Sequence, residues 1–385
     1  MAALVVVAVL ILVVPALPVV STAVSHVASG GPSGSISWGG PNFAVTTIAT
    51  SRSGKFVGAV GGADSLYMGL LDGTVLRIDP LSGRVTGSAV LPDGNAAAHL
   101  AYYDGALYVG TEHLRGAKDA APYHVYKIDP GTMGVTRTLP MDSHWANGLL
   151  IPFNGYLWAA DGGCTLYKID PGTLNVVSKT RGIAEDELTF DGSRYWGECR
   201  EAVNVFRISN GTPVVTATGA LDYPNRPRGF FVIGTRVYSS GSLSFGLYSM
   251  TLRGDRVEFK DSGLKGNRSY PTRDTVFYDG YVFAYMTGPD ADAMKMHASV
   301  LVYAPGLHLR AVVRLPGPAL CADASQHTLF LYGGRLVFVT ASTVGHVTPV
   351  MGVQRWGGGQ VSPMAIRGPT NPGPPQARVR RPGWG

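Results

Sequence analysis

The chain has 385 residues, of which 45% are hydrophobic, only 15% are charged and 51 are glycine. A chain of this length can bury a large core, and little charge with much glycine is typical of strands joined by tight turns. No long stretch has helical periodicity, which disfavours an α/β fold. Four of the six net positive charges come from arginines near the C-terminus, and the +2 that remains predicts no basic face for nucleic acid.

Residues 1–32 form an apolar N-terminal segment, and the first charged residue of the chain is Arg52. The segment predicts an export signal cleaved after Ala23 or a retained membrane anchor. Its start lacks basic residues, and Pro15 and Pro18 interrupt a straight membrane helix, so both interpretations stay open, as does a buried or self-assembling strand. In each case, the membrane is contacted only through this segment.

A turn motif occurs three times, as VLRIDPLSGRVT at 75–86, VYKIDPGTMGVT at 125–136 and LYKIDPGTLNVV at 166–177. Alternating apolar residues on both sides of each Asp-Pro pair predict two half-buried strands joined in a hairpin. We expect the carboxylates of Asp79, Asp129 and Asp170 to accept hydrogen bonds from backbone N–H groups of their own turns. We expect Gly83, Gly134 and Asn175 to supply the residue with positive φ, with Gly83 one place earlier than the other two.

Two further strands precede each hairpin, so the repeating unit has four strands. The spacing from Ile78 to Ile128 is 50 residues and that from Ile128 to Ile169 is 41 residues, which is typical of propeller blades. Fainter copies continue the pattern, and the last one has only three strands. The extra strand at 42–50 would complete it and leave no open sheet edge. The sequence therefore predicts an all-β, seven-bladed β-propeller over residues 33–356, with four-stranded blades and closure by an N-terminal strand.

Two of the three cysteines follow the second strands of neighbouring units. Cys164 and Cys199 would lie in equivalent loops side by side, which favours a disulfide in an exported protein, with two buried free thiols as the alternative. Cys321 would then be unpaired. The chain has no CxxC or CxxCH motif, so structural zinc and covalent haem are not indicated.

We expect a ligand site where the loops that enter the innermost strands gather around the central channel. Charged, imidazole and aromatic side chains occur in these loops, and the candidate ligand-binding residues are His144, Trp145, Asn147, Glu187, Arg226, Arg228 and Asp274. Mutual neutralisation of these charges is the competing interpretation. Glu187 and Arg228 are expected to matter more for binding than the Asp-Pro aspartates, which would lie on the opposite, structural face.

The repeats, as in Leu107-Tyr108 and the segment Tyr167 to Pro171, resemble the propeller superfamily that holds the YVTN and NHL repeats, gluconolactonase-like proteins, streptogramin lyase and quinoprotein-like repeats. The resemblance covers roughly residues 40–356 and rests on scaffold residues. For a gluconolactonase-like enzyme it implies a divalent metal at Glu187, Asn147 and Asp274, with Asp323 as a further candidate. The tryptophan pattern of quinone-dependent dehydrogenases is absent.

Residues 357–385 form a Gly/Pro-rich flexible tail that contains Arg367, Arg378, Arg380 and Arg381 and no acidic residue. With no catalytic signature in the sequence, we expect an exported or cell-surface binding or interaction module. Its partner would be an extracellular or surface protein, a small polar ligand or a second copy of the chain, and not nucleic acid. No cofactor is predicted. The alternative is a metal-dependent, lactonase-like hydrolase or lyase that uses the channel site.

Overall fold

The computed structural model describes residues 27–29, 32–33, 43–51, 56–112, 123–141, 147–185, 187–200, 202–220, 227–233, 236–241, 247–261, 272–286, 297–304, 308–318 and 328–349. Within these ranges every regular element is a β-strand and none is a helix, so the all-β prediction is confirmed. No helix among the described residues could span a membrane.

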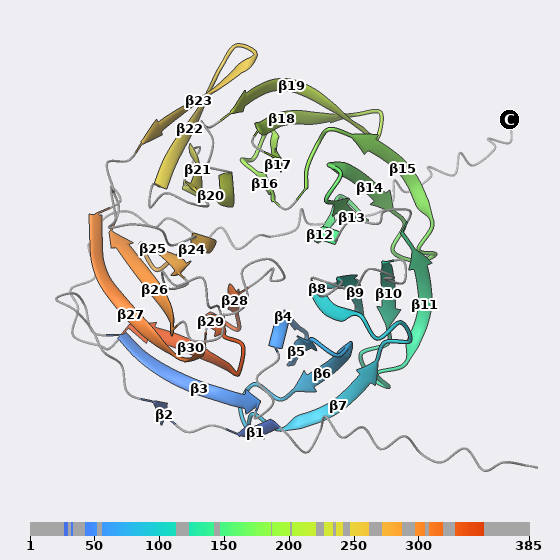
Figure 1. The fold of residues 1–385 in the computed structure, drawn as a ribbon, viewed down its shortest axis with the longest axis vertical. Helices are drawn as coiled ribbons and strands as arrows, with labels where there is room; N and C mark the ends of the chain where they lie inside the picture. The colour runs from blue at the N-terminus through green and yellow to red at the C-terminus, as the bar shows by residue number, and fades with distance from the viewer. Residues whose placement is uncertain are drawn as a thin grey trace, which may run out of the picture.

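The strands form four-stranded antiparallel groups that follow one another along the chain and are arranged in a ring (Figure 1). The first group contains β4 (Phe56–Gly62), β5 (Ser65–Leu70), β6 (Thr74–Ile78) and β7 (Val85–Val90). The second contains β8 (Ala96–Tyr103), β9 (Ala106–Glu112), β10 (His124–Ile128) and β11 (Val135–Pro140). The third contains β12 (Asn147–Phe153), β13 (Tyr156–Asp161), β14 (Thr165–Ile169) and β15 (Val176–Arg181).

An eight-stranded sheet follows, and it consists of two such groups. One half contains β16 (Leu188–Phe190), β17 (Tyr195–Cys199), β18 (Ala202–Ser209) and β19 (Thr212–Ala220). The other contains β20 (Pro227–Ile233), β21 (Arg236–Gly241), β22 (Leu247–Arg253) and β23 (Arg256–Asp261). The outer strands β19 and β23 meet in a single parallel pair, Thr218 with Arg256. The next group contains β24 (Thr272–Tyr278), β25 (Tyr281–Met286), β26 (His297–Ala304) and β27 (His308–Pro318).

The last group joins both ends of the described chain. Its strands β28 (Leu329–Tyr332), β29 (Arg335–Val339) and β30 (Thr343–Pro349) pair in sequence order. The outermost strand is β3 (Phe43–Ser51), which pairs antiparallel with β30 from Phe43–Pro349 to Thr50–Thr343. The N-terminal strand thus completes the sheet that the C-terminal strands begin, as the sequence predicts. Two short strands, β1 (Val27–Ser29) and β2 (Pro32–Ser33), pair with β3 in turn.

Apolar side chains pack between neighbouring groups, so the core is a series of seams between sheets. One seam joins Tyr67 and Val75 of the first group to Leu107 and Val109 of the second. Each fully buried aliphatic side chain contributes roughly 1.5–3 kcal/mol to stability. Glycine permits the close approach of sheets, because a Cβ at Gly69 of β5 would collide with the carbonyl oxygen of Ala97 in β8.

The Asp-Pro turns have the hydrogen bonds that the sequence predicts. The Asp79 carboxylate accepts bonds from the backbone N–H groups of Leu81 and Ser82, at 2.8 and 3.1 Å. Asp129 accepts from Thr132 N and Oγ1 at 2.8 and 3.0 Å, and Asp170 accepts from Thr173 N and Oγ1 at 2.7 and 2.9 Å. The bonds from the backbone N–H groups are the main cause that lowers the pKa of each carboxyl.

The prediction for the positive-φ residue is correct at Gly83 and wrong in the other two turns. Positive φ occurs at Gly83, Met133 and Leu174, with values of 68°, 59° and 59°, and not at Gly134 or Asn175. These three residues occupy the same place, because the N–H of each bonds to the carbonyl of its turn's aspartate at 2.8 Å. Met133 and Leu174 tolerate the left-handed conformation because their side chains are buried in the seams on either side of the second group.

The basic residue two positions before each Asp connects neighbouring groups. Arg77 Nη1 donates to the Gly131 carbonyl of the next group at 3.1 Å, and Lys127 Nζ donates to the Pro171 carbonyl at 2.9 Å. Lys168 Nζ lies 3.5 Å from the Gly211 carbonyl one group further. The repeated motif therefore supplies a turn and also a bond to the turn that follows it.

Candidate functional site

The antiparallel strands place two kinds of connection on opposite faces of the ring. The turn face carries the Asp-Pro turns and the hairpins between first and second strands. The face that we call the channel face carries the connections β7–β8, β9–β10, β13–β14, β15–β16 and β17–β18. The polar networks described below all lie on the channel face, in the second, third and fourth groups or just before them.

Asp93, in the β7–β8 connection, fastens the two strands that flank the longest connection of the second group. Its Oδ2 accepts a bond from Thr111 Oγ1 of β9 at 3.1 Å and lies 2.9 Å from His124 Nδ1 of β10. Thr111 Oγ1 in turn accepts the backbone N–H of His124 at 3.0 Å. Burial and then the Asp93 carboxylate raise the pKa of Tyr126. This network therefore connects the end of β9 to the start of β10.

A second imidazole–carboxylate pair lies on the other side of the same group. His99 of β8 and Glu112 of β9 are buried, with Nε2 of His99 3.7 Å from Oε2 of Glu112. A bulge between Ala97 and His99 brings His99 opposite Gly110, two residues before Glu112. The distance between these two atoms exceeds that of a hydrogen bond, so the pair is a close contact between a buried imidazole and a buried carboxyl group.

Asp161 at the end of β13 organises the corresponding connection of the third group. Its Oδ1 accepts the backbone N–H groups of Gly163 and Thr165 at 3.0 and 2.8 Å, and its Oδ2 accepts the Tyr167 hydroxyl at 2.9 Å. The carboxylate is buried with all of these donors directed at it. Asp161 is therefore a structural group that shapes the turn holding Cys164.

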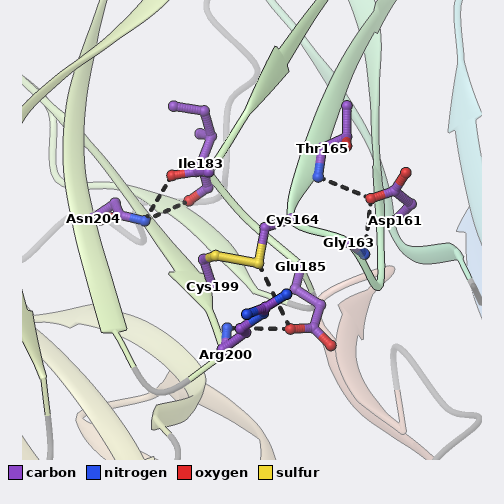
Figure 2. Close-up of a disulfide and its surroundings, with 10 residues drawn as sticks. Asp161, Gly163, Cys164, Thr165, Ile183, Glu185, Cys199, Arg200 and Asn204 are labelled. Carbon is purple, nitrogen blue, oxygen red and sulfur yellow. Dashed lines mark hydrogen bonds between the residues drawn. A yellow bond between two sulfur atoms is a disulfide. The ribbon is translucent and has the colours of Figure 1, made fainter.

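Cys164 and Cys199 form a disulfide between the third and fourth groups, which confirms the predicted pairing (Figure 2). Their Cα atoms are 5.4 Å apart, and 35 residues separate them in the sequence. Glu185 Oε2 lies 3.9 Å from Cys164 Sγ, which is a packing contact because a disulfide sulfur carries no proton. The same oxygen accepts the backbone N–H of Arg200 at 3.1 Å.

The β15–β16 connection is anchored from both sides of this disulfide (Figure 2). The Ile183 N–H donates to the Cys164 carbonyl at 3.1 Å, and Asn204 Nδ2 donates to the carbonyls of Gly182 and Ile183 at 3.0 and 3.2 Å. Glu185 N–H donates to the Glu198 carbonyl at 2.6 Å, and Glu198 N–H donates to the Glu187 carbonyl at 3.0 Å. Backbone bonds to Glu198 therefore connect both Glu185 and Glu187 to β17.

The structure places some of the predicted site residues and not others. Glu187 lies on the channel face, partly buried at the start of the fourth group. Asn147, Arg228 and Asp274 belong to the first strands β12, β20 and β24, but their side chains are outside the described part. His144, Trp145, Arg226 and the further metal candidate Asp323 lie outside the described residues altogether, as does Cys321. The ligand-binding role of the set stays a prediction.

Among the described residues, no three His, Cys, Asp or Glu side chains come close enough together to hold a metal ion. The proposed metal set of Glu187, Asn147 and Asp274 is not tested by this, because two of its side chains are not described. Sequence reasoning missed the roles of Asp93, Asn204 and the His99–Glu112 pair. No local pattern links Asp93 to His124, because 31 residues separate them in the sequence.

No protein-family model matches the chain, and no curated protein matches it in sequence. Among solved structures, BamB from Moraxella catarrhalis is similar, with a TM-score of 0.54 and 11% sequence identity over 83% of this chain and 99% of that chain. At this identity the similarity concerns the fold alone. Together with the ring of four-stranded antiparallel sheets, it shows that the fold is a β-propeller.

Proposed function

We propose that the protein is a seven-bladed β-propeller in which each four-stranded group is one blade. The two halves of the eight-stranded sheet count as separate blades, because a single parallel pair joins them. The pairing of β3 with β30 supports closure of the ring by the N-terminal strand. Solution of the fold with six or eight blades would contradict this count.

We further propose that the propeller is exported or attached to the cell surface and acts there as a binding or interaction module. Two observations support export: the apolar 1–32 segment of the sequence and the Cys164–Cys199 disulfide, since disulfides form and persist in oxidising compartments. Cell fractionation with sequencing of the mature N-terminus tests this part. Recovery of the full-length chain from the cytosol would contradict it.

The binding surface that we propose is the channel face, and its partner is an extracellular or surface protein or a small polar ligand. The observation that carries this proposal is the contrast between the faces. Asp79, Asp129 and Asp170 accept bonds within their own turns in the same way in three successive groups, whereas the channel-face connections differ from group to group, with the Asp93–His124 contact in one place and the Cys164–Cys199 disulfide in another. Loops that differ between repeats of a common scaffold are where binding residues collect.

The test compares variants of the two faces. Immobilised wild-type protein is incubated with the extracellular fraction of its source to recover a partner. The amount of that partner bound is then compared between the wild type, Arg228→Ala and Asp129→Ala. If the Arg228 guanidinium binds a charged group of the partner, Arg228→Ala should weaken binding by about 1–3 kcal/mol. Asp129→Ala should leave binding unchanged. The opposite pattern would show that the faces are assigned the wrong way round.

The same preparation separates a binding module from the metal-dependent lactonase-like alternative. Metal content is measured by elemental analysis, alongside turnover of simple lactones and esters. For a binding module we expect neither a stoichiometric metal nor turnover. Calcium or zinc that is lost in Glu187→Gln and Asn147→Ala, together with turnover, would establish the enzyme instead.

A further inference from the structure

Three outermost strands of the sheets contain no charged residue: β3 (FAVTTIATS), β7 (VTGSAV) and β19 (TPVVTATGA). The other outermost strands, β11, β15, β23 and β27, each contain at least one lysine or arginine. Charged side chains on edge strands prevent pairing with other chains. An uncharged edge therefore needs another form of protection or a partner.

Two of the three uncharged edges are covered within the chain. The short strands β1 and β2 pair with β3. The guanidinium of Arg77 lies along β7, where Nη2 donates to the Thr86 carbonyl at 2.9 Å and Nε donates to Thr86 Oγ1 at 3.0 Å. The protein thus protects an uncharged edge either with a strand or with a cation.

The third uncharged edge, on β19, is covered only at its C-terminal end. Thr218 pairs with Arg256 of β23, and its N–H donates to the Asp255 carbonyl at 3.1 Å. Over residues 212–217, no described strand pairs with β19 on its outer side. Figure 1 shows β19 on the outer rim of the ring.

The side chains of this open stretch are apolar or hydroxyl-bearing; Pro213 and Ala217 are buried, and the other four are exposed. Val214 and Val215 are 48% and 42% exposed. Val177 of the neighbouring outer strand β15 is also exposed, and the contact of Lys168 Nζ with the Gly211 carbonyl holds the start of β19 next to that group. The edge and the valines together form a small, uncharged surface at the rim.

We propose that residues 212–217 pair antiparallel with the same residues of a second copy, around a two-fold axis. A strand without charges can lie opposite itself without like-charge contacts, and β-branched residues form favourable cross-strand pairs. This register places Val214 opposite Val215 of the second copy and Pro213, which has no N–H to donate, opposite Thr216, away from the axis. The residues resemble the VTTIAT stretch of β3, the edge on which the chain already places a strand.

This arrangement forms a closed dimer and no filament, because the two copies use the same edge and leave none free. Six paired residues bury less area than a standard interface, so the dimer should be weak and dependent on concentration. The surface lies on the rim, away from the channel face, and its test requires no partner for the channel face. Failure of either proposal is therefore seen separately.

The experiment is sedimentation velocity of the full chain from low to several hundred micromolar protein. Val215→Lys places a charged side chain on this edge, opposite Val214 of the second copy, and Val214→Lys places one opposite Val215; a charged side chain on an edge strand opposes pairing with another chain. The matched control is Val90→Lys on β7, where the replaced valine is 54% exposed. Circular dichroism establishes that each variant retains the melting behaviour of the folded protein.

We expect reversible dimers for the wild type and for Val90→Lys, and monomers at every concentration for whichever of Val215→Lys and Val214→Lys folds. A monomeric wild type would overturn the proposal. So would a Val215→Lys or Val214→Lys variant that dimerises as the wild type does, equal loss of the dimer in Val90→Lys, or larger assemblies that persist in every variant.

Discussion

The two faces of the ring differ in how the repeated sequence is used. On the turn face, Asp79, Asp129 and Asp170 make the same bonds in successive groups, each to the backbone of its own turn. On the channel face, each group has its own arrangement, with Asp93 and His124 in one place and the Cys164–Cys199 disulfide in another. The comparison teaches that repetition marks the scaffold, and that the face where the repeats diverge is the place to look for function.

The largest effect should come from the channel face, through loss of the disulfide. Replacement of both Cys164 and Cys199 by alanine removes a link across 35 residues, which should lower the free energy of unfolding by about 4 kcal/mol. Thermal melting followed by circular dichroism measures this change. Reductant should lower the melting temperature of the wild type and leave the double variant unaffected. Equal sensitivity of both proteins would assign the loss to something other than this bond.

Leu174 tests the turn face, because it combines a buried side chain with a φ of 59°. Leu174→Ala should lower stability by about 3 kcal/mol through lost burial. Leu174→Gly loses the same contacts but relieves the strain of the left-handed conformation, so it should be at least as stable as the alanine variant. Urea denaturation compares the two.

Leu150 of β12 is the matched control for this series, since it is equally buried but lies in an extended strand. At Leu150 the glycine variant should be less stable than the alanine variant by about 0.5–1 kcal/mol. The same order of stabilities at both positions would show that the conformation of Leu174 does not limit the choice of residue.

A smaller effect is expected for the bond that Lys127 makes to the next turn. Lys127→Met keeps the aliphatic stem and removes the donor to the Pro171 carbonyl, so stability should fall by about 1 kcal/mol. Chemical denaturation measures this loss of stability, and Lys260→Met of β23 serves as the control. Partner binding should be unchanged in both variants, and a loss of binding in Lys127→Met alone would contradict the division between the faces.

The smallest effect concerns the pH dependence of the turn-face aspartates. The bonds from Thr132 keep the pKa of Asp129 below its ordinary value of 3.8 in the folded protein. The stabilisation is therefore present above that value and is lost as the pH falls through the lower, folded-state pKa. Asp129→Asn should flatten the acid limb of the melting-temperature profile slightly. An acid limb as steep in Asp129→Asn as in the wild type would contradict this contribution.

Local sequence signals were enough to predict the strands, the Asp-Pro turns and the disulfide, because alternation, turn chemistry and repeat position each act over a short distance. The positive φ at Met133 and Leu174 was missed, because the prediction relied on the preference of glycine and asparagine for this conformation. In the structure the burial of these two side chains between neighbouring sheets determines the position instead. The Asp93 network was also missed. Its members His124 and Asp93 are 31 residues apart, and only the stacking of one group on the next brings them together.

The pairing of β3 with β30 has a consequence for how the protein is made. Phe43 and Pro349 are partners in this ladder, so the last sheet cannot form until nearly the whole chain has left the ribosome. Earlier sheets can fold on each other while synthesis continues, but the ring stays open until β3 can pair with β30. If the chain is exported as proposed, this order favours secretion, because a propeller that cannot close early stays incompletely folded and can still pass through a secretion channel.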